Sequence, residues 1–361
     1  MILIRFPFNM DLKTCKGVMT KMRKQKERNA LSAAISYFRK KKNLSLEQVC
    51  EGLCSVATLT RIEQGERSAD SLLGTLLLER IGKEAEQFEL LQNDEDYALW
   101  KKRGDIQDLM QQKQYQKVYQ ELAFYREMKQ MTPDLHEQFC LYQEVLIGLA
   151  LLSEQEKTDN KKEVCENILI KVLKALRLTK PAFGKDGAPP KQLYTQTEIE
   201  LTQILTHYST PEFYKSQNIG GNIGFAEEKR AELLRILEYI EYFYTERRKE
   251  EIGVSITIEL AELERSFGNY AKAIEYLEKG ISFVSQGRGI KSLEKLHFLK
   301  AQALFAQLGA EHANTENRKE IQRECLMAYC TCEVCGLTES AKKIEVFCRE
   351  KMEWQITELE M

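Results

Sequence analysis

Proline is almost absent from long stretches of this sequence, and its absence limits the folds open to the chain. The chain has 6 prolines in 361 residues, about a third of the number expected at roughly 5% usage. All-β sandwiches and barrels need many Gly- and Pro-rich turns. Three of the six, Pro181, Pro189 and Pro190, fall between helical segments, and none interrupts a segment with helical periodicity. We therefore expect an all-α protein.

Charge is distributed unevenly along the chain. Residues 1–42 carry 12 Lys and Arg but only 2 Asp and Glu, a local charge of +10, whereas residues 43–361 carry −12. A basic end on an acidic body is typical of a protein whose basic end meets a polyanion, because phosphate contacts depend on Lys and Arg. The alternative is a solvated basic tail without a partner.

The sequence contains no membrane or secretory signal. No run of 18 apolar residues is present, so we expect no membrane span, and the N-terminus lacks the order of segments found in a signal peptide. We therefore expect a cytoplasmic protein whose 10 cysteines are reduced. Residues 1–30 lack helical periodicity and predict a poorly ordered basic extension, in which Met19 and Met22 are alternative translation starts.

Four short helical segments fill residues 31–90, the predicted first domain. Apolar residues recur at helical spacing in each of them. Ser45 and Ser55 are N-cap residues before the second and third segments, and Gln48 completes a capping box with Ser45. Gly65 fits the left-handed position that ends a helix. The predicted helices span residues 31–42, 46–53, 56–64 and 70–81.

The segment Leu44–Gly82 resembles the helix-turn-helix of the phage-repressor, or Cro-type (XRE), family. The residues that carry the resemblance are Leu44-Ser45-Leu46-Glu47-Gln48-Val49-Cys50-Glu51-Gly52-Leu53 and Thr58-Leu59-Thr60-Arg61-Ile62-Glu63-Gln64-Gly65-Glu66-Arg67. Two departures from the family pattern occur. Ala69 or Asp70 replaces the usual proline after the glycine turn, and Glu51-Gly52 stands where a small residue is common. Neither departure falls at a position that the family uses to contact DNA bases.

The resemblance implies that the third helix lies in the major groove of double-stranded DNA while the second crosses the backbone. The positions that it places at base edges are Val56, Ala57, Thr60 and Arg61, of which Arg61 is the candidate for a bidentate contact with guanine. Glu63 is implied to be structural and is not assigned to DNA. Candidates for phosphate contacts are Ser45, Gln48, Ser55, Thr58, Arg67 and the run Arg39–Lys42.

Pairs of amphipathic helical segments fill residues 94–358, the predicted second domain. The clearest pair, Val254–Gly287, resembles a tetratricopeptide repeat (TPR), a helix–turn–helix unit. Its turn is Gly268-Asn269-Tyr270, and Thr257 stands where the repeat usually has an aromatic residue. Small residues that let the two helices approach closely are Ala261, Ala273 and Gly280.

Weaker copies of this pair lie on both sides of it. Such units cannot bury their apolar faces alone, so we expect them to stack into an α-solenoid with a concave surface. Longer loops are expected at Pro181–Pro190 and Pro211–Gly224. The other predicted helices span residues 94–111, 115–130, 134–153, 162–178, 190–208, 226–247, 289–308, 317–335 and 338–358.

A Cro-type head followed by TPR-like repeats resembles the peptide-pheromone-responsive regulators of Gram-positive bacteria, the RNPP group with its Rgg-like branch. The resemblance implies a transcription regulator that binds a palindromic operator as a homodimer. It also implies a short signalling peptide held on the concave face of the repeats. The concave positions of the best repeat, which otherwise form a solvated helix face, are Ser255, Ile258, Glu262, Arg265 and Ser266.

The sequence leaves three functions open. The first is a DNA-binding regulator controlled by a peptide or another ligand, and the second is a DNA-binding regulator whose repeats only dimerise or hold another protein. The third is an interaction protein of a kinase or phosphatase pathway whose head no longer binds DNA, which the charge asymmetry and Arg61 disfavour. Metalloprotease, hydrolase, Walker and dinucleotide-binding motifs are missing from the sequence, so we expect neither an enzyme nor a cofactor.

Four cysteines, Cys325, Cys330, Cys332 and Cys335, cluster near the C-terminus. Their spacing is poor for a zinc ribbon. The segment has helical periodicity, with Cys325, Ala328 and Cys332 on one face. We therefore predict thiols of an apolar core and no metal site. The alternative is a redox pair formed by Cys332 and Cys335.

Overall fold

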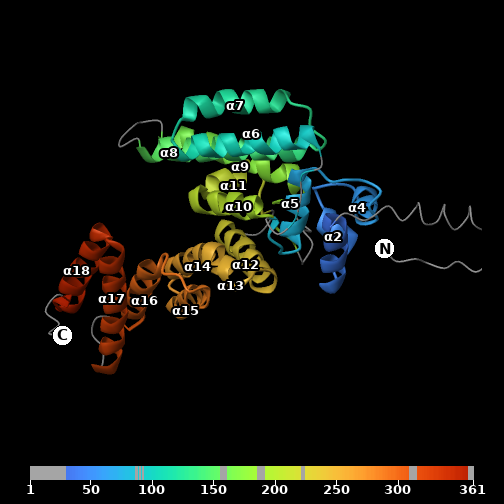
Figure 1. The fold of residues 1–361 in the computed structure, drawn as a ribbon. Coiled ribbons are helices and arrows are strands. Elements are labelled where there is room, and N and C mark those ends of the chain that lie inside the picture. Colours follow the sequence, from blue (N-terminus) through green and yellow to red (C-terminus); the bar gives the residue numbers. More distant parts are fainter. Residues whose placement is uncertain are drawn as a thin grey trace, which may run out of the picture. The chain divides into compact units, whose positions relative to one another are not determined.

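The computed structural model of the chain describes residues 30–85, 88, 91, 93–154, 161–184, 192–220, 224–308 and 315–356. These ranges contain helices and connecting segments but no strand, which confirms the predicted all-α class (Figure 1). No helix within them is long and apolar enough to cross a membrane. The predicted basic extension, residues 1–30, lies outside the described ranges except for Ala30.

The chain folds as two compact units. The first comprises the described residues up to Pro181 together with Thr195–Glu198, and the second comprises the others. The sequence suggested a boundary between residues 90 and 94 instead. In the structure, residues on both sides of that boundary belong to the first unit.

The first unit begins with four short helices that lie close to their predicted positions. Ser45 accepts a hydrogen bond from the backbone N–H of Gln48, whose side chain accepts one from the N–H of Ser45, so the predicted capping box is present. Ser55 caps the next helix by accepting from the N–H of Thr58. Gly65 follows that helix with a φ of +73°. The helices are α2 (Ala30–Lys41), α3 (Leu46–Cys50), α4 (Val56–Glu63) and α5 (Ser71–Arg80).

Apolar side chains from these helices form the core of the head, which we define as residues 30–85. Leu59 and Ile62, the predicted inward face of α4, are fully buried together with Ile35 of α2 and Leu77 of α5. Burial of each such side chain stabilises the fold by about 1.5–3 kcal/mol. Because this face of α4 is buried, the opposite face is left at the surface.

Two longer helix pairs complete most of the first unit. α6 packs against α7, and α8 packs against α9. The buried side chains of Ile106, Val118 and Leu122 join α6 to α7. α7 ends at Glu127, before the predicted residue 130, because Met128 adopts extended backbone angles. The helices are α6 (Asp94–Gln111), α7 (Tyr115–Glu127), α8 (Pro133–Glu154) and α9 (Lys161–Thr179).

Buried polar side chains fix the head to these pairs. Asp96, at the start of α6, accepts hydrogen bonds from the N–H (2.9 Å) and the hydroxyl (2.7 Å) of Ser71 in α5. Arg103 donates to the same hydroxyl at 2.9 Å, and Thr132 donates to Asp70 at 2.9 Å. Buried polar groups are costly unless they are paired. These paired groups therefore hold the head and α6–α8 in one arrangement.

The second unit repeats the helix-pair pattern, with local departures from the predicted bounds. The predicted loop Pro211–Gly224 contains a short helix, α11, because Thr210 caps it and Pro211 occupies its first turn. α12 ends at Phe243, before the predicted residue 247, since Tyr244 is extended. The first turn of α10, up to Glu198, belongs to the first unit. The elements are α10 (Gln196–Tyr208), α11 (Pro211–Ser216), α12 (Phe225–Phe243), α13 (Glu246–Arg248), the π-helical turn η2 (Lys249–Gly253), α14 (Val254–Ser266), α15 (Tyr270–Gly287), α16 (Leu293–Leu308), α17 (Thr315–Cys335) and α18 (Thr338–Met352).

The pair α14 and α15 has the close helix contact expected of a TPR-like unit. Ala261 and Ala273 are fully buried. A Cβ atom placed on Gly280 would lie 2.6 Å from both the Thr257 hydroxyl and a methyl group of Leu296. Thr257 is itself buried and donates to the carbonyl of Val254. Thr257, which stands where the repeat usually has an aromatic residue, thus packs directly against Gly280.

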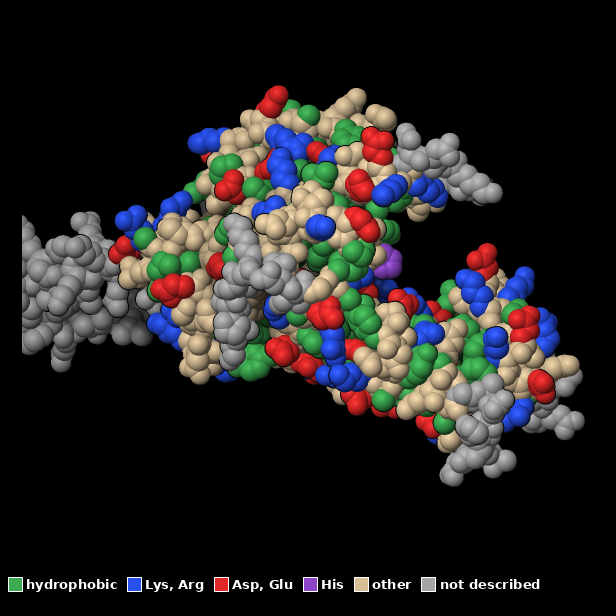
Figure 2. All heavy atoms as spheres, turned by 180° about the vertical axis from the view of Figure 1, so that it is seen from behind, with side chains coloured by type: hydrophobic (Ala, Val, Ile, Leu, Met, Phe, Trp, Pro, Cys, Tyr) green, Lys and Arg blue, Asp and Glu red, His purple; other side chains and the backbone are tan. Residues whose placement is uncertain are grey.

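The cysteine cluster lies on α17, and its members differ in exposure. Cys325 and Cys332 are fully buried in a core with Ala328, as predicted, whereas Cys330 and Cys335 are exposed. Within the described ranges, no group of three His, Cys, Asp or Glu side chains is arranged to hold a metal ion. Figure 2 shows charged side chains of both signs around scattered apolar ones, as amphipathic helices with buried apolar faces present them.

Candidate functional site

The surface of α4 carries the residues predicted to contact bases. Val56, Ala57 and Arg61 are exposed, and Thr60 is partly exposed. The Thr60 hydroxyl donates to the carbonyl of Val56 at 2.9 Å. The Arg61 guanidinium has no hydrogen bond or ion pair with any described residue. Its donors are therefore available to a ligand outside the chain, such as a guanine edge.

The start of α4 forms a short chain of hydroxyl groups with Arg67. Ser55 caps the helix, and its hydroxyl also donates to Thr58 Oγ1 at 3.0 Å. Arg67, beyond the end of α4, donates to the same oxygen at 3.3 Å. Because Thr58 Oγ1 accepts twice, its own proton is free to be donated outward. A phosphate here would meet this proton, the Arg67 charge and the free N–H groups of the helix N-terminus.

The predicted phosphate contacts at α3 are bound into its cap. Ser45 and Gln48 use one side-chain oxygen each in the capping box, at 3.1 and 2.9 Å. Ser45 is exposed and Gln48 is partly exposed. Ser45 also forms a side-chain hydrogen bond with Glu47, which helps to lower the pKa of that carboxyl, so of the two residues Gln48 keeps side-chain hydrogens to donate outward. All nine residues predicted for DNA binding thus lie on α3 or α4, at their N-caps or on the segment directly after α4, and none of them is buried.

Arg39 is a correction to the predicted phosphate-binding run Arg39–Lys42. Its guanidinium is largely buried and forms a bidentate ion pair with Glu63, at 2.6 and 2.8 Å. It also donates to the carbonyl of Leu44 at 2.9 Å. The hydrogen bond to Glu63 raises the pKa of Arg39 above its ordinary value. Arg39 therefore joins α2 to α4, and Glu63 has the structural role that the resemblance implied.

Lys42 differs from the two lysines before it. Lys40 and Lys41 are exposed, whereas Lys42 is only partly exposed. Its pKa is lowered to about 8, first by burial and then by the charge of Lys83. The Lys83 ammonium lies 4.2 Å from the centre of the Phe38 ring. Lys42 is thus a cation whose charge is sensitive to pH near neutrality and to any nearby anion.

The predicted ligand face on α14 is only partly at the surface. Ser255 and Ser266 are exposed and donate to carbonyls of their own helix turn. Ser255 also accepts from Gln203 of α10 at 2.8 Å. Ile258 is a correction, because it is only 6% exposed. α14 contacts α12, α15 and η2, so its apolar residues are not confined to one face.

The two charged residues of the predicted ligand face on α14 contact α16, the first helix of the next pair. Glu262 forms an ion pair with Lys295 of α16 at 3.2 Å. Arg265 donates to Gln302 of α16 at 3.1 Å. Both α16 residues line a cavity of about 270 Å³. The cavity could not be predicted from the sequence, because it depends on how α16 and α18 pack and not on the repeat pattern of either helix.

α10 adds further polar groups that no motif in the sequence pointed to. His207 lies 3.4 Å from Glu259 of α14, and Thr206 donates to the same carboxylate at 3.2 Å. The hydrogen bond with Glu259 raises the pKa of His207 above its ordinary value. The periodicity of α10 did not point to these residues, since histidine and threonine occur equally on solvated faces.

Comparison with known proteins finds no matching family model and no matching curated protein. Solved structures that it resembles include PlcR of Bacillus thuringiensis in complex with the peptide PapR7 and DNA, at 16% identity and a TM-score of 0.45 over 88% of this chain and 99% of that one. The competence regulator ComR of Streptococcus vestibularis, in its apo form, is 14% identical with a TM-score of 0.38, over 90% and 98%.

Proposed function

We propose that the protein is a sequence-specific regulator of transcription that binds double-stranded DNA through α3 and α4. A second part of the proposal is that a short peptide on the concave side of the repeats controls this binding. The protein would act as a homodimer on a palindromic operator, because one head of this size makes few base contacts. The observation that carries the proposal is the exposed side of α4, where Arg61 lies free beside the hydroxyl chain of Ser55 and Thr58.

The division of labour on α4 follows from the chemistry of its side chains. Arg61 offers paired donors that match guanine O6 and N7. Val56 and Ala57 offer only apolar contacts, for example to a thymine methyl. Thr58 and Arg67 supply positioning contacts to phosphate, which carry no sequence information. We therefore expect modest base readout from each head, with DNA shape contributing to selectivity.

Selection of bound fragments from genomic DNA tests the proposed DNA binding. An enriched palindrome is the expected result, and recovery of random fragments contradicts the proposal. Arg61→Ala should then weaken binding to the selected site by about 1–3 kcal/mol and relax preference at one position of each half-site. Gln64→Ala is the matched control, since Gln64 is also exposed, at the end of α4.

The peptide part of the proposal is supported by the polar face that α10, α14 and α16 share. Gln203, Glu259 and Glu262 contribute side chains that join neighbouring helices by hydrogen bonds or ion pairs at this face. Melting the full-length protein with a library of short peptides tests this part, because a ligand that binds only the folded state raises the melting temperature. DNA binding without any peptide-induced shift favours the alternative, in which the repeats only dimerise or hold another protein.

A further inference from the structure

A cavity between α16 and α18 has the size and lining of a pocket for one side chain. Its volume is about 270 Å³, below the ~300–1,000 Å³ typical of sites for drug-sized ligands. Its apolar lining includes Phe298 and Leu299 of α16 and Ile344 of α18. The Phe298 ring meets the Phe347 ring edge-on with centroids 5.5 Å apart, which fixes its orientation. The cavity therefore suits a single aliphatic or aromatic group.

The rim of the cavity carries charges on both helices. Lys343 of α18 is exposed and has no hydrogen bond or ion pair with any described residue. Lys295 of α16 also lines the cavity, but its charge is offset by Glu262 at 3.2 Å. Glu294 lies on the α16 side of the rim. An anionic group is therefore favoured at Lys343 and disfavoured at the opposite rim.

The cavity continues the polar face of α14. Lys295 and Gln302 both line it, and they contact Glu262 and Arg265 of α14. A peptide lying along the exposed residues of α14 therefore reaches the cavity without crossing an intervening helix. The C-terminal residue of such a peptide can place its side chain in the cavity. The peptide chain ends there, so no further peptide residue has to pass between the cavity and α18.

We infer that the cavity holds the C-terminal residue of a short peptide, with an apolar side chain inside and the terminal carboxylate on Lys343. The inference rests on the proposed peptide control and specifies the ligand that it requires. Phe298, Leu299 and Ile344 exclude water from the side chain, which contributes the apolar part of the affinity. Lys343 supplies a charge-assisted hydrogen bond, and Glu294 on the far rim sets the direction in which the peptide lies.

Fluorescence anisotropy of the full-length protein with labelled heptapeptides tests the inference. Each probe carries an N-terminal fluorescein and a Gly-Ser body. Its C-terminal residue is the one that varies, as Leu, Ile or Phe. Each is compared with its C-terminal amide and with a C-terminal Ser version. The free carboxylate with an apolar end should bind about tenfold more tightly than the amide, as expected for loss of a hydrogen bond to a charged group.

Two pairs of variants locate the effect. Lys343→Gln should remove the difference between carboxylate and amide, whereas Lys342→Gln, at an exposed neighbour that does not line the cavity, should preserve it. Ser340→Trp, at the partly exposed rim, should fill the cavity and abolish binding of the apolar-ended peptides. Thr338→Trp is its control, because Thr338 is exposed and lies outside the cavity. Melting curves of all four variants show whether each has folded.

The outcomes separate this inference from the proposed function. Equal binding of amide and carboxylate, or equal behaviour of the Lys343 and Lys342 variants, overturns the pocket assignment while peptide control stands. Absence of binding by every probe overturns the pocket assignment, whereas peptide control is overturned only if the peptide library also leaves the melting temperature unchanged. DNA selection is measured on the same preparation, so a loss of DNA binding identifies failure of the proposed regulator itself.

Discussion

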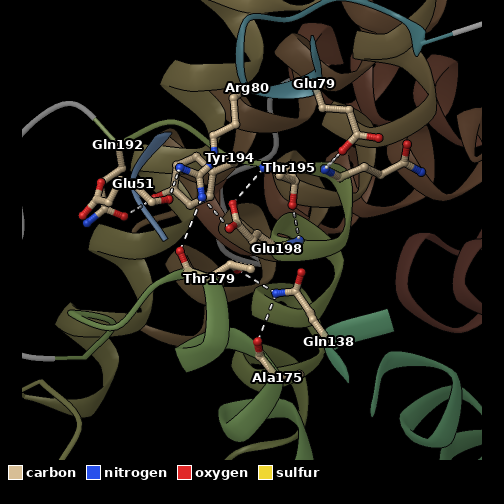
Figure 3. Close-up of polar contacts among 11 residues, drawn as sticks. Glu51, Glu79, Arg80, Gln138, Ala175, Thr179, Gln192, Tyr194, Thr195 and Glu198 are labelled. Atoms are coloured by element: carbon tan, nitrogen blue, oxygen red, sulfur yellow. Dashed lines mark hydrogen bonds and ion pairs between the residues drawn. The ribbon is translucent and has the colours of Figure 1, made fainter. Parts of the chain in front are cut away.

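Arg80 of α5 and Glu198 of α10 form an ion pair of 2.6 Å in which neither side chain is exposed (Figure 3). Burial alone would raise the pKa of Glu198. The charges of Arg80 and Lys180, with hydrogen bonds from Thr179 and Thr195, instead hold that pKa below its ordinary value. The pair is therefore charged at neutral pH, and it joins the last helix of the head to the first turn of α10.

Breaking this pair should destabilise the first unit strongly. Glu198→Gln or Arg80→Met each leaves one uncompensated buried partner, which costs about 3–5 kcal/mol. The double variant should lose less than the sum of the two single variants, because neither Arg80 nor Glu198 is then left as a charge without the other. Calorimetry of the four proteins measures the coupling, and additive losses contradict it. Glu95→Gln is the control, since its ion pair with Lys129 is exposed and should contribute little.

Local signals in the sequence were sufficient for the head. Ser45, Ser55 and Gly65 act on backbone groups within a few residues, so the helix ends beside them could be predicted from the local sequence. The end of α3 was predicted wrongly, because the helix stops at Cys50 and not at residue 53, before Gly52 with its positive φ of +69°. The same holds for the inward face of α4, because Leu59 and Ile62 lie almost one helical turn apart. Exposure of Arg61 follows directly from the burial of that face.

Contacts between distant residues could not be predicted in this way. Arg80 and Glu198 are 118 residues apart, and Ser71 and Asp96 are 25 apart. No periodicity connects such partners, and both pairs place charge where sequence patterns favour the surface. Ile258 was misplaced because α14 is covered on several sides, so its spacing did not identify a single exposed face.

Glycine positions in the repeats give a matched pair of stability predictions. Gly280→Ala places a methyl group 2.6 Å from Thr257 and Leu296, and such overpacking costs about 1–3 kcal/mol. Gly104→Ala on α6 meets no atom within 4 Å. It should therefore stabilise the protein by about 0.5–1 kcal/mol, since alanine is the better helix former. Thermal unfolding of both variants checks the opposite signs, and a stabilising Gly280 variant would falsify the close contact.

His136 should make the first unit sensitive to acid. Arg103 donates to the hydroxyl of Tyr125 at 3.1 Å, and that hydroxyl is hydrogen-bonded to His136 Nδ1. The pKa of His136 is lowered from 6.5 to about 4, chiefly by burial and further by the charge of Arg103. Between pH 4 and pH 6.5, the unfolded chain therefore binds more protons at this histidine than the folded protein does. Stability is full above pH 6.5 and falls as the pH drops toward 4, by roughly 3 kcal/mol.

Melting temperatures between pH 7.5 and 4 measure this effect. His136→Asn keeps an acceptor for Tyr125 but cannot be protonated in this range, so its slope should be shallower than that of the natural protein. His207→Asn serves as the control, because His207 is exposed and its pKa is raised. It should keep the acid slope. An unchanged slope in the His136 variant would show that another group is responsible.

Lys42 should couple DNA binding to proton uptake. Its pKa is about 8 in the free protein, lowered by burial and by Lys83. A phosphate beside it would favour the charged form and raise that pKa. DNA affinity should therefore be constant below about pH 7 and fall as the pH rises through 8, approaching a tenfold loss per pH unit for one proton taken up. Anisotropy titrations at fixed salt with the selected operator measure the slope. Lys42→Met should remove the pH step while Lys40→Met keeps it, and the same step in both variants would exclude Lys42 from the interface.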